Sequence, residues 1–180
     1  MSDPVLKLIG VDIGFPGESP LLSDLDFEAF AGEVIGIIGI SGIGKTTFLR
    51  TLAGLQAPLD GEMTVLGESS FSDVEKGAIG YIPQRLGLVN HQTVGYNVLM
   101  GALPGARWWQ SLLSLPSPEM NQRTREAVSA VGLSNKIHDQ VSQLSGGQQR
   151  RVAVARSLIQ KPSIILADEC LGDLDLATSE

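Results

Sequence analysis

Apolar and polar positions in the first third of the chain follow the two-residue period of β-strands. Residues 5–13 are rich in Val, Leu and Ile, and residues 24–29 alternate acidic with apolar side chains, which is typical of a half-exposed strand. Residues 34–38 are continuously apolar and stand before a glycine-rich loop and a helical pattern. A short apolar run in that position predicts a strand buried on both faces of a parallel sheet.

The pattern then changes to a helix and returns to strands. Apolar residues recur at helical spacing over residues 48–55, which predicts an amphipathic helix. Asp60-Gly61 predicts a turn before a strand at residues 63–66. A further short strand is predicted at residues 78–82.

Beyond these strands the chain becomes more polar and its pattern helical. Thr93 is placed to cap a helix that runs through Met100. Ser117-Pro118-Glu119 supplies a cap residue, a proline at the first helical position and an acid in the first turn. This stretch is therefore expected to be a helical insertion into an α/β core.

The α/β pattern resumes with an amphipathic helix at residues 149–160 and a buried strand at residues 163–167. The elements predict one α/β domain with a helical segment inserted into it. The expected divisions of that domain are a core with a β subdomain at residues 1–84, the helical insertion at 85–143 and the return to the core at 144–180.

Composition is that of an ordinary globular protein. The 180 residues are 43% hydrophobic and 18% charged, enough for one domain with a core. The net charge of -7 argues against broad nucleic-acid binding. The single cysteine, Cys170, excludes an internal disulfide and fits a reducing compartment. The first residues lack a signal-peptide pattern and no apolar run reaches the roughly 18–20 residues that span a bilayer, so a membrane role is expected to come through a partner.

A phosphate-loop pattern, G-x-x-x-x-G-K-[ST], occupies residues 39–46. Its glycines let backbone N–H groups point at phosphate, Lys45 is expected to reach the β- and γ-phosphates, and the Thr46 hydroxyl to ligate magnesium. An unrelated glycine-rich turn is the alternative, and the apolar run before the loop and the helix after it argue against that alternative. The predicted nucleotide contacts in this stretch are Gly39, Ser41, Gly42, Gly44, Lys45, Thr46 and Thr47.

Two acidic residues end the strand predicted at residues 163–167. Carboxylates at the C-terminal end of a parallel strand lie where ligands bind. Asp168 is placed to hold magnesium, directly or through water, and Glu169 is a candidate general base for the attacking water. An exposed acidic turn is the alternative, and the phosphate loop in the same chain disfavours it.

Gln84 follows the strand predicted at residues 78–82. Its amide is a candidate ligand of magnesium and water at the start of the helical insertion. Taken alone, an ordinary surface glutamine is the better interpretation, because glutamine is mostly exposed. The predicted catalytic residues are Lys45, Gln84 and Glu169, and the predicted metal ligands are Thr46, Gln84 and Asp168.

A second glycine pair lies in Leu144-Ser145-Gly146-Gly147-Gln148, directly before the helical pattern at 149–160. Helix starts present free N–H groups and a partial positive charge, so this stretch predicts a second phosphate-type cradle. One triphosphate needs only one loop around it. The second cradle is therefore expected to serve a nucleotide held by another copy of the chain.

These motifs, in this order, resemble the ATP-binding cassette ATPases, the motor subunits of ABC transporters. The resemblance implies a P-loop NTPase core with a mainly parallel sheet, an antiparallel β subdomain and an inserted helical subdomain, with ATP and Mg²⁺ as ligands. Residues 109–113 and 174–180 are most similar to the ATP-binding subunits of phosphonate importers. The matching motifs are the phosphate loop, Gln84, the signature 144–148 with Gln149-Arg150-Arg151, the acidic strand end and the loop 171–175.

The resemblance implies a head-to-tail homodimer with two ATP molecules at its interface. Ser145 and Gly147 of one chain would touch the γ-phosphate held by Lys45 of the other, in a site that closes against water. Gly146, Gln148 and Asp175 complete the contacts that the resemblance implies across this interface.

The resemblance also implies the partners and the location of the chain. The helical insertion would dock on an integral-membrane permease and pass the motion of the dimer to it. A periplasmic or extracellular binding protein would act indirectly, and no nucleic acid is expected. The chain is then expected to be cytoplasmic and peripheral on the inner face of the cell membrane.

The aromatic and histidine residues contribute less to the functional interpretation than the motifs do. The family position favours stacking of Phe15 on adenine, although aromatic residues are more often core. For Trp108-Trp109, a partner contact and a partly buried pair are both open. His91 and His138 have no ligand spacing and are expected to be surface or packing residues.

Two features depart from the family pattern. Cys170 stands where the family usually has proline. The sequence ends at Glu180, before the strand and the switch histidine that normally follow, so a fragment or a truncated product that binds ATP and hydrolyses it poorly is expected. Two further hypotheses remain besides the importer ATPase: a non-hydrolysing ATP-binding protein, and a non-transport cassette protein that acts on nucleic acid or ribosomes.

Overall fold

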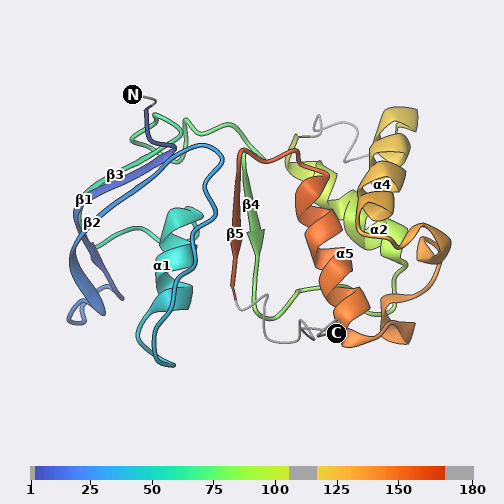
Figure 1. Ribbon diagram of the computed structural model, residues 1–180, viewed down its shortest axis with the longest axis horizontal. Helices are drawn as coiled ribbons and strands as arrows, with labels where there is room; N and C mark the ends of the chain where they lie inside the picture. Colours follow the sequence, from blue (N-terminus) through green and yellow to red (C-terminus); the bar gives the residue numbers. More distant parts are fainter. Residues whose placement is uncertain (1–2, 106–116, 169–180) are drawn as a thin grey trace, which may run out of the picture. The chain divides into compact units, whose positions relative to one another are not determined.

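The computed structural model describes residues 3–105 and 117–168 (Figure 1). These residues fall into two compact units, residues 1–75 and residues 76–180. Within the described ranges, no helix combines the length and apolarity needed to cross a bilayer.

An antiparallel sheet of three strands forms the first unit. Its strands are β1 (Leu6–Ile13), β2 (Leu22–Ala29) and β3 (Asp60–Val65), in the spatial order β2-β1-β3. Three of the four strands predicted in this unit, at residues 5–13, 24–29 and 63–66, are therefore confirmed, although β3 already begins at Asp60, where a turn was predicted.

A β-bulge in β1 explains why its buried positions change phase. Leu6 and Leu8 are buried before the bulge, and Val11 and Ile13 are buried after it. Strict alternation would turn the second pair outward, so one extra residue is needed between the pairs. Gly10 supplies it with a φ of 55°, a left-handed conformation that glycine adopts readily.

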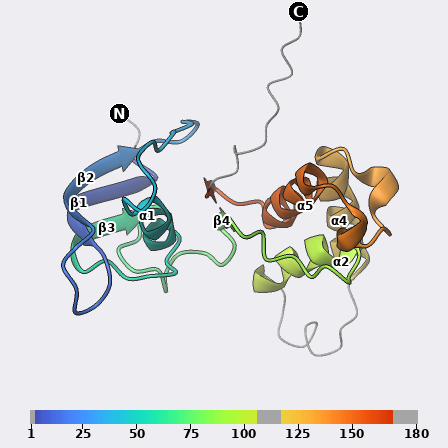
Figure 2. The ribbon, with the colours of Figure 1, turned by 90° about the horizontal axis from the view of Figure 1, so that it is seen from below.

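The helix α1 (Lys45–Leu52) packs against this sheet (Figure 2). Phe48, Leu49 and Leu52 are buried on its inner face, as the helical spacing predicted. The rings of Phe48 and Phe27 meet edge to face, with centroids 5.8 Å apart, a favoured aromatic geometry. The sheet and this aromatic contact hold α1 in place, and with it the helix start that directly follows the glycine-rich loop.

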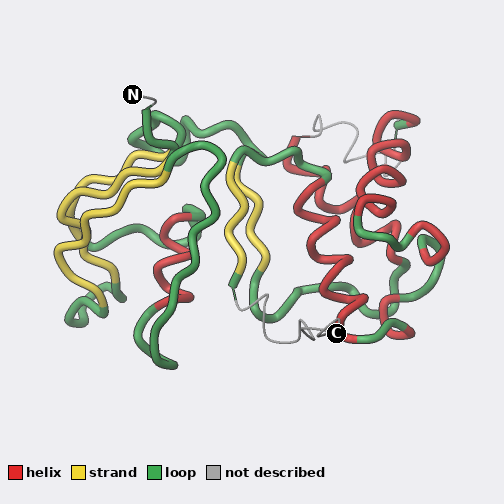
Figure 3. The backbone as a smooth tube through the Cα atoms, in the orientation of Figure 1, coloured by secondary structure: helices red, strands yellow, loops and turns green. Residues whose placement is uncertain are grey.

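The strand predicted at residues 34–38 is wrong. This segment is a loop in the structure (Figure 3), and Val34 and Ile38 are 101% and 98% exposed. A strand buried on both faces needs backbone partners along it and elements that cover it, and among the described residues the antiparallel sheet has none for this segment. Apolar residues favour burial, but a strand also needs neighbouring strands to hydrogen-bond with. Residues 34–38 have no such neighbour among the described residues.

The second unit holds a parallel pair of strands, β4 (Ile79–Ile82) and β5 (Ile164–Ala167). Both strands were predicted at these places. The last strand was predicted to be buried, and this is only partly correct, because Leu166 is buried whereas Ile165 is 49% exposed. The sheet has two strands among the described residues, so one face of β5 stays uncovered there.

The other regular elements described in this unit are helical, and the starts of α2 and α4 follow cap chemistry. The Thr93 hydroxyl accepts a hydrogen bond from the Tyr96 N–H at the start of α2 (Val94–Leu99). Ser117 does the same for Met120 at the start of α4 (Pro118–Ala130). Both predicted caps are confirmed. The remaining helical elements are η1 (Met100–Gly105), η2 (Ser134–Lys136), η3 (Val141–Gln143) and α5 (Gly146–Leu158).

Backbone hydrogen bonds join residues 92–95 to residues 137–141, where the chain enters and leaves this helical region; this pairing is called the clamp. The backbone N–H groups of Val94 and Gly95 donate to the carbonyls of Asp139 and Ile137, and Val141 N–H donates to Gln92. The helices α2, α4 and α5 lie side by side next to these segments (Figure 1), and their buried side chains form one apolar core. The buried members of that core are Val94, Val98, Ala127, Val128, Leu133, Val141, Leu144, Val152, Ala155 and Ile159.

Asn97 is a buried amide that shapes the segment before α2. Its Oδ1 accepts a hydrogen bond from the Val89 N–H at 2.7 Å, and its Nδ2 donates to the carbonyls of Val89 and Thr93. We expect Asn97→Ala to lower the free energy of unfolding by about 2 kcal/mol, because these backbone groups lose their partner. Urea unfolding followed by circular dichroism measures this change. The exposed Asn121→Ala on α4 is the control, and an equal effect of both substitutions would contradict the role given to Asn97.

Candidate functional site

The phosphate-loop pattern forms a tight turn that leads directly into α1. Gly42 and Gly44 have φ values of 81° and 107°, which side-chain-bearing residues rarely adopt. Gly44 is the N-cap residue of α1 and has no capping side chain, so no side chain of the cap covers the first N–H groups of the helix. A helix start of this kind is a binding site for an anion.

Lys45 bridges the two ends of this loop. Its ammonium donates to the carbonyls of Gly39 at 2.8 Å and Ile40 at 2.9 Å. A lysine ammonium has three donor protons, so one remains for a further acceptor. The loop thus presents one cation and a row of N–H groups, a donor set that fits the oxygens of a polyphosphate.

Gln84 and Asp168 leave the parallel sheet at the same edge. Ile82 and Ala167 are paired at the ends of β4 and β5, and the Asp168 N–H donates to the Ile82 carbonyl at 2.9 Å. Asp168 is 3% exposed, and Gln84 follows two residues after Ile82. One carboxylate and one amide oxygen at a strand-end edge are ligands suited to a hard cation such as Mg²⁺.

The signature stretch forms the start of α5, closed by a capping box. The Ser145 hydroxyl accepts from the Gln148 N–H at 3.3 Å, and the Gln148 Oε1 accepts from the Ser145 N–H at 3.0 Å. The helix begins at Gly146, three residues before the predicted start. A strong cap explains the difference, because it allows the glycine pair to serve as the first turn of the helix.

Gly146 and Gly147 have no structural need to be glycine. Neither has a positive φ, and a Cβ added at either would meet nothing within 4 Å. Glycine in a helix costs about 0.5–1 kcal/mol relative to alanine. A pair of glycines that the fold itself does not require is typical of a surface that something else approaches closely.

The predicted residues are distributed over the two units. The first unit carries the phosphate loop and Phe15, whose side chain is 46% exposed in the loop after β1. The second carries Gln84, Asp168 and the signature. The structure therefore brings together the loop residues with each other and Gln84 with Asp168. Glu169, Asp175, Cys170 and Trp108-Trp109 lie outside the described residues.

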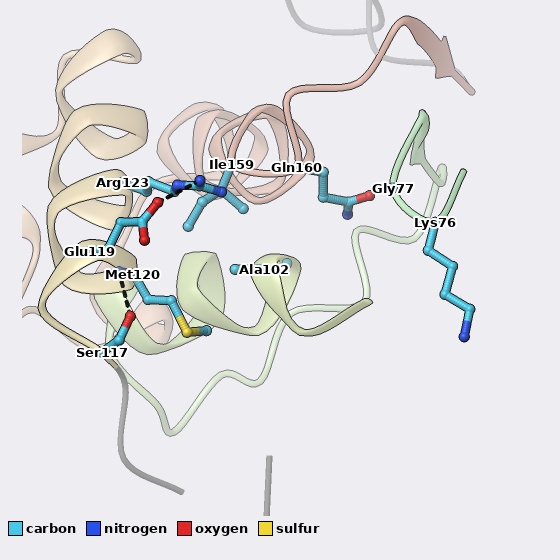
Figure 4. A pocket seen from close by; sticks show the side chains of 10 residues that line it. Lys76, Gly77, Ala102, Ser117, Glu119, Met120, Arg123, Ile159 and Gln160 are labelled. Carbon is cyan, nitrogen blue, oxygen red and sulfur yellow. Dashed lines mark hydrogen bonds and ion pairs between the residues drawn. The ribbon is translucent and has the colours of Figure 1, made fainter. Parts of the chain in front are cut away.

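Two cavities among the described residues lie away from the predicted nucleotide contacts. A cavity of about 190 Å³ in the second unit is bordered by η1, α4 and α5, with the Glu119–Arg123 ion pair on its wall (Figure 4). A larger one of about 760 Å³ in the first unit lies over β1 and β3. No residue predicted to bind nucleotide lines either cavity, so the candidate phosphate sites are exposed loops and helix starts.

Comparison with known proteins decides the family. The family model described as ABC transporter matches residues 22–172. The chain belongs to the ABC transporter family. An α/β P-loop NTPase fold follows from this, with the antiparallel and parallel sheets and the helical insertion described above. ATP binding is the activity of the family to which the phosphate loop and the signature stretch belong.

Three relatives show how far this ABC similarity extends. The phosphonates import ATP-binding protein PhnC of Bdellovibrio bacteriovorus is 37% identical over 185 residues, covering 99% of this chain and 71% of the relative. The lipoprotein-releasing system ATP-binding protein LolD 2 of Caulobacter vibrioides is 34% identical over 189 residues, covering 99% of this chain and 79% of the relative. The structure of cbiO1 from Clostridium perfringens, part of the ABC transporter complex cbiONQ, has a TM-score of 0.77 and 25% identity, covering 93% of this chain and 66% of that one.

The sequence pattern did not point to two polar residues of this ABC domain that hold loops in place. Asn97 fixes the segment before α2, and Arg156 on α5 contacts the loop after Gln84. The partners of Arg156 lie 69 and 70 residues away in the sequence, so no local spacing relates them. A buried amide or cation inside an apolar helical pattern is the one signal that marks such residues in advance.

Proposed function

We propose that this chain is the ATP-binding and ATP-hydrolysing subunit of an ABC importer and that it works as a homodimer on an integral-membrane permease. The observation that carries the proposal is the pair of helix starts suited to phosphate. One is α1 with its uncapped N–H groups, and the other is α5 with two glycines that the fold does not need. Two such sites in one chain support two half-sites that two chains complete.

Each residue has a separate role in the proposed reaction. Lys45 and the loop N–H groups hold the β- and γ-phosphates, and Phe15 stacks on the adenine. Thr46, Gln84 and Asp168 hold Mg²⁺, which when bound neutralises charge on the phosphates. Glu169 accepts the proton of the attacking water. Ser145 and Gly147 of the partner subunit donate to the γ-phosphate and exclude water from it, with Asp175 close to the same interface.

The transported substrate in this proposal is a phosphonate or a related small solute, recognised by the permease and an external binding protein. Support comes from the relatives named as phosphonates import ATP-binding proteins, which match nearly the whole chain. The similarity to a lipoprotein-releasing ATP-binding protein supports lipoprotein release as the second candidate. The proposed place of the chain is the cytoplasmic face of the cell membrane, through the permease.

Purification of the tagged chain from membranes of its own cells tests the partner. We expect an integral-membrane permease to be recovered with it, and ATP hydrolysis of the recovered complex to rise when a phosphonate-loaded binding protein is added. Stimulation by lipoprotein substrates instead would favour the second candidate. Recovery with RNA or DNA and no permease would contradict both.

The proposed base is tested by Glu169→Gln, which keeps the size of the side chain and removes its ability to take a proton. We expect hydrolysis to fall by about 100-fold, the lower range for loss of a general base, while ATP affinity changes by less than about 2-fold. Single-turnover assays with protein in excess over radiolabelled ATP resolve even slow hydrolysis, and filter binding gives the affinity. An unchanged rate in the variant would remove Glu169 from this role.

A further inference from the structure

Arg156 lies near the C-terminal end of α5 and reaches the loop that follows Gln84. Its Nη1 donates to the Gly87 carbonyl at 2.7 Å, and its Nη2 donates to the Leu86 carbonyl. Gly87 has a φ of 60°, so the chain turns sharply there. Two neighbouring carbonyls meet the two N–H groups of one planar guanidinium, a geometry that fixes direction as well as distance.

The backbone that carries Arg156 is held on two sides. Gly80 of β4 lies so close to α5 that an added Cβ would collide with the Ser157 Oγ. Gly101 of η1 lies equally close to the Arg156 carbonyl. This part of α5 is therefore fixed against both β4 and η1, and the guanidinium holds the loop from a rigid base.

A contribution to folding stability does not by itself explain why an arginine occupies position 156. The side chain is half-buried, and burial lowers the pKa of the Arg156 guanidinium from its ordinary value. Among residues 3–105 and 117–168, the ion pairs that form join other residues, so its described partners are neutral carbonyls. A half-buried cation without a carboxylate costs free energy that an apolar side chain would avoid, whereas two directed donors define where the loop lies.

We propose that Arg156 is the positioning residue of Gln84: by holding the Leu86 and Gly87 carbonyls it sets the loop that presents the Gln84 amide, and it ties that loop to the helix that begins with the signature. This inference rests on the proposed function, in which Gln84 is a ligand of Mg²⁺. The loop that senses the metal and the helix start that meets the partner subunit then move together, because one side chain joins them within the second unit.

The Mg²⁺ dependence of ATP hydrolysis tests the inference in the full chain. Loss of a residue that orients a metal ligand costs about 10-fold in metal affinity, so we expect Arg156→Met to raise the half-saturating Mg²⁺ concentration by about that factor. ATP binding measured without Mg²⁺ should stay within about 2-fold of wild type. Arg156→Lys, which keeps the charge and one directed donor, should fall between the two. Arg123→Met on α4, where arginine pairs with Glu119 at the surface, should behave as wild type.

A double variant separates positioning from a general loss of structure. In a Gln84→Ala background, Arg156→Met should change the half-saturating Mg²⁺ concentration by less than about 2-fold, because both substitutions act on the same ligand. A full 10-fold shift in that background would overturn the inference, as would an unchanged Mg²⁺ dependence in a folded Arg156→Met protein. If Arg156→Met unfolds, Arg156→Lys alone decides, and a wild-type Mg²⁺ dependence in it overturns the inference.

Hydrogen exchange distinguishes failure of this inference from failure of the proposed function. The amides of residues 85–89 should exchange at least about 5-fold faster in Arg156→Met than in Arg123→Met. A wild-type chain that neither binds nor hydrolyses ATP would refute the proposed function, and faster exchange would then still support the structural link. Equal exchange in the two variants overturns the inference whatever the activity.

Discussion

Gly147→Asp is expected to abolish ATP-driven dimerisation and to lower ATP hydrolysis by about 10³-fold while leaving the fold intact. The aspartate keeps the backbone N–H of residue 147, but its carboxylate would repel the γ-phosphate of the partner subunit and hold that phosphate away from the N–H. Loss of one well-placed donor to a transition-state oxyanion costs about 10²–10³-fold. The fold should tolerate the change because a Cβ at this position meets nothing within 4 Å. An acid in the first turn of α5 is also favourable to the helix dipole.

Thermal unfolding, size-exclusion chromatography and ATP turnover, each compared with wild type, check this prediction. Thermal unfolding should be within about 2 °C of wild type, or higher, since glycine is replaced in a helix. Size-exclusion chromatography with ATP should show a dimer for wild type and a monomer for the variant. Asn121→Asp on the exposed surface of α4 adds the same charge and should dimerise normally. A Gly147→Asp chain that dimerises and turns over ATP at the wild-type rate would remove the signature from the proposed interface.

Lys45→Met is expected to reduce ATP hydrolysis by about 10³-fold, the scale of one well-placed cation on a transferring phosphoryl group. Two effects combine in this variant. The cation that would meet the phosphates is lost, and so are the hydrogen bonds that join the α1 start to the Gly39 and Ile40 carbonyls. Methionine keeps the length of the stem, so packing around α1 should change little.

Single-turnover hydrolysis and nucleotide binding separate the two effects of Lys45→Met. Binding of ATP should weaken by more than about 10-fold, and binding of adenosine, which carries no phosphate, should be unchanged because stacking is independent of Lys45. Lys136→Met, which removes a cation paired with Asp139 at 3.1 Å, is the control and should bind and hydrolyse as wild type. Hydrolysis in Lys45→Met at the rate of this control would contradict the phosphate-loop assignment.

Local chemistry made most of the helix starts predictable from the sequence. Thr93 and Ser117 cap helices as predicted, because the hydroxyl and the N–H that it accepts from lie within one turn. The phosphate loop was predictable for the same reason, since its conformation depends on glycines within eight residues. The start of α5 was placed too late because the capping box joins Ser145 to Gln148 across the glycines.

Pairing between distant segments was less predictable. Residues 34–38 have the composition of a central strand, yet composition does not supply the neighbours that a strand needs, and the segment is a loop. Ile165 was likewise expected to be buried and is exposed, because among the described residues no element covers its face of β5. Arg156 and Asn97 were missed because a polar side chain on a helix gives no sign of which loop carbonyl it meets.

The clamp between residues 92–95 and 137–141 allows the sequence of the helical region between them to change in evolution. The chain leaves and returns at points joined by backbone hydrogen bonds, which depend on no particular side chain. Sequence between Tyr96 and Lys136 can therefore diverge, or be swapped between relatives, provided that Asn97 keeps its backbone contacts and that Val98 and Val128 keep their places in the core. Under the proposed function, a lineage can thus refit this region to a new permease while the strand ends and the helix starts that are proposed to meet nucleotide stay where they are.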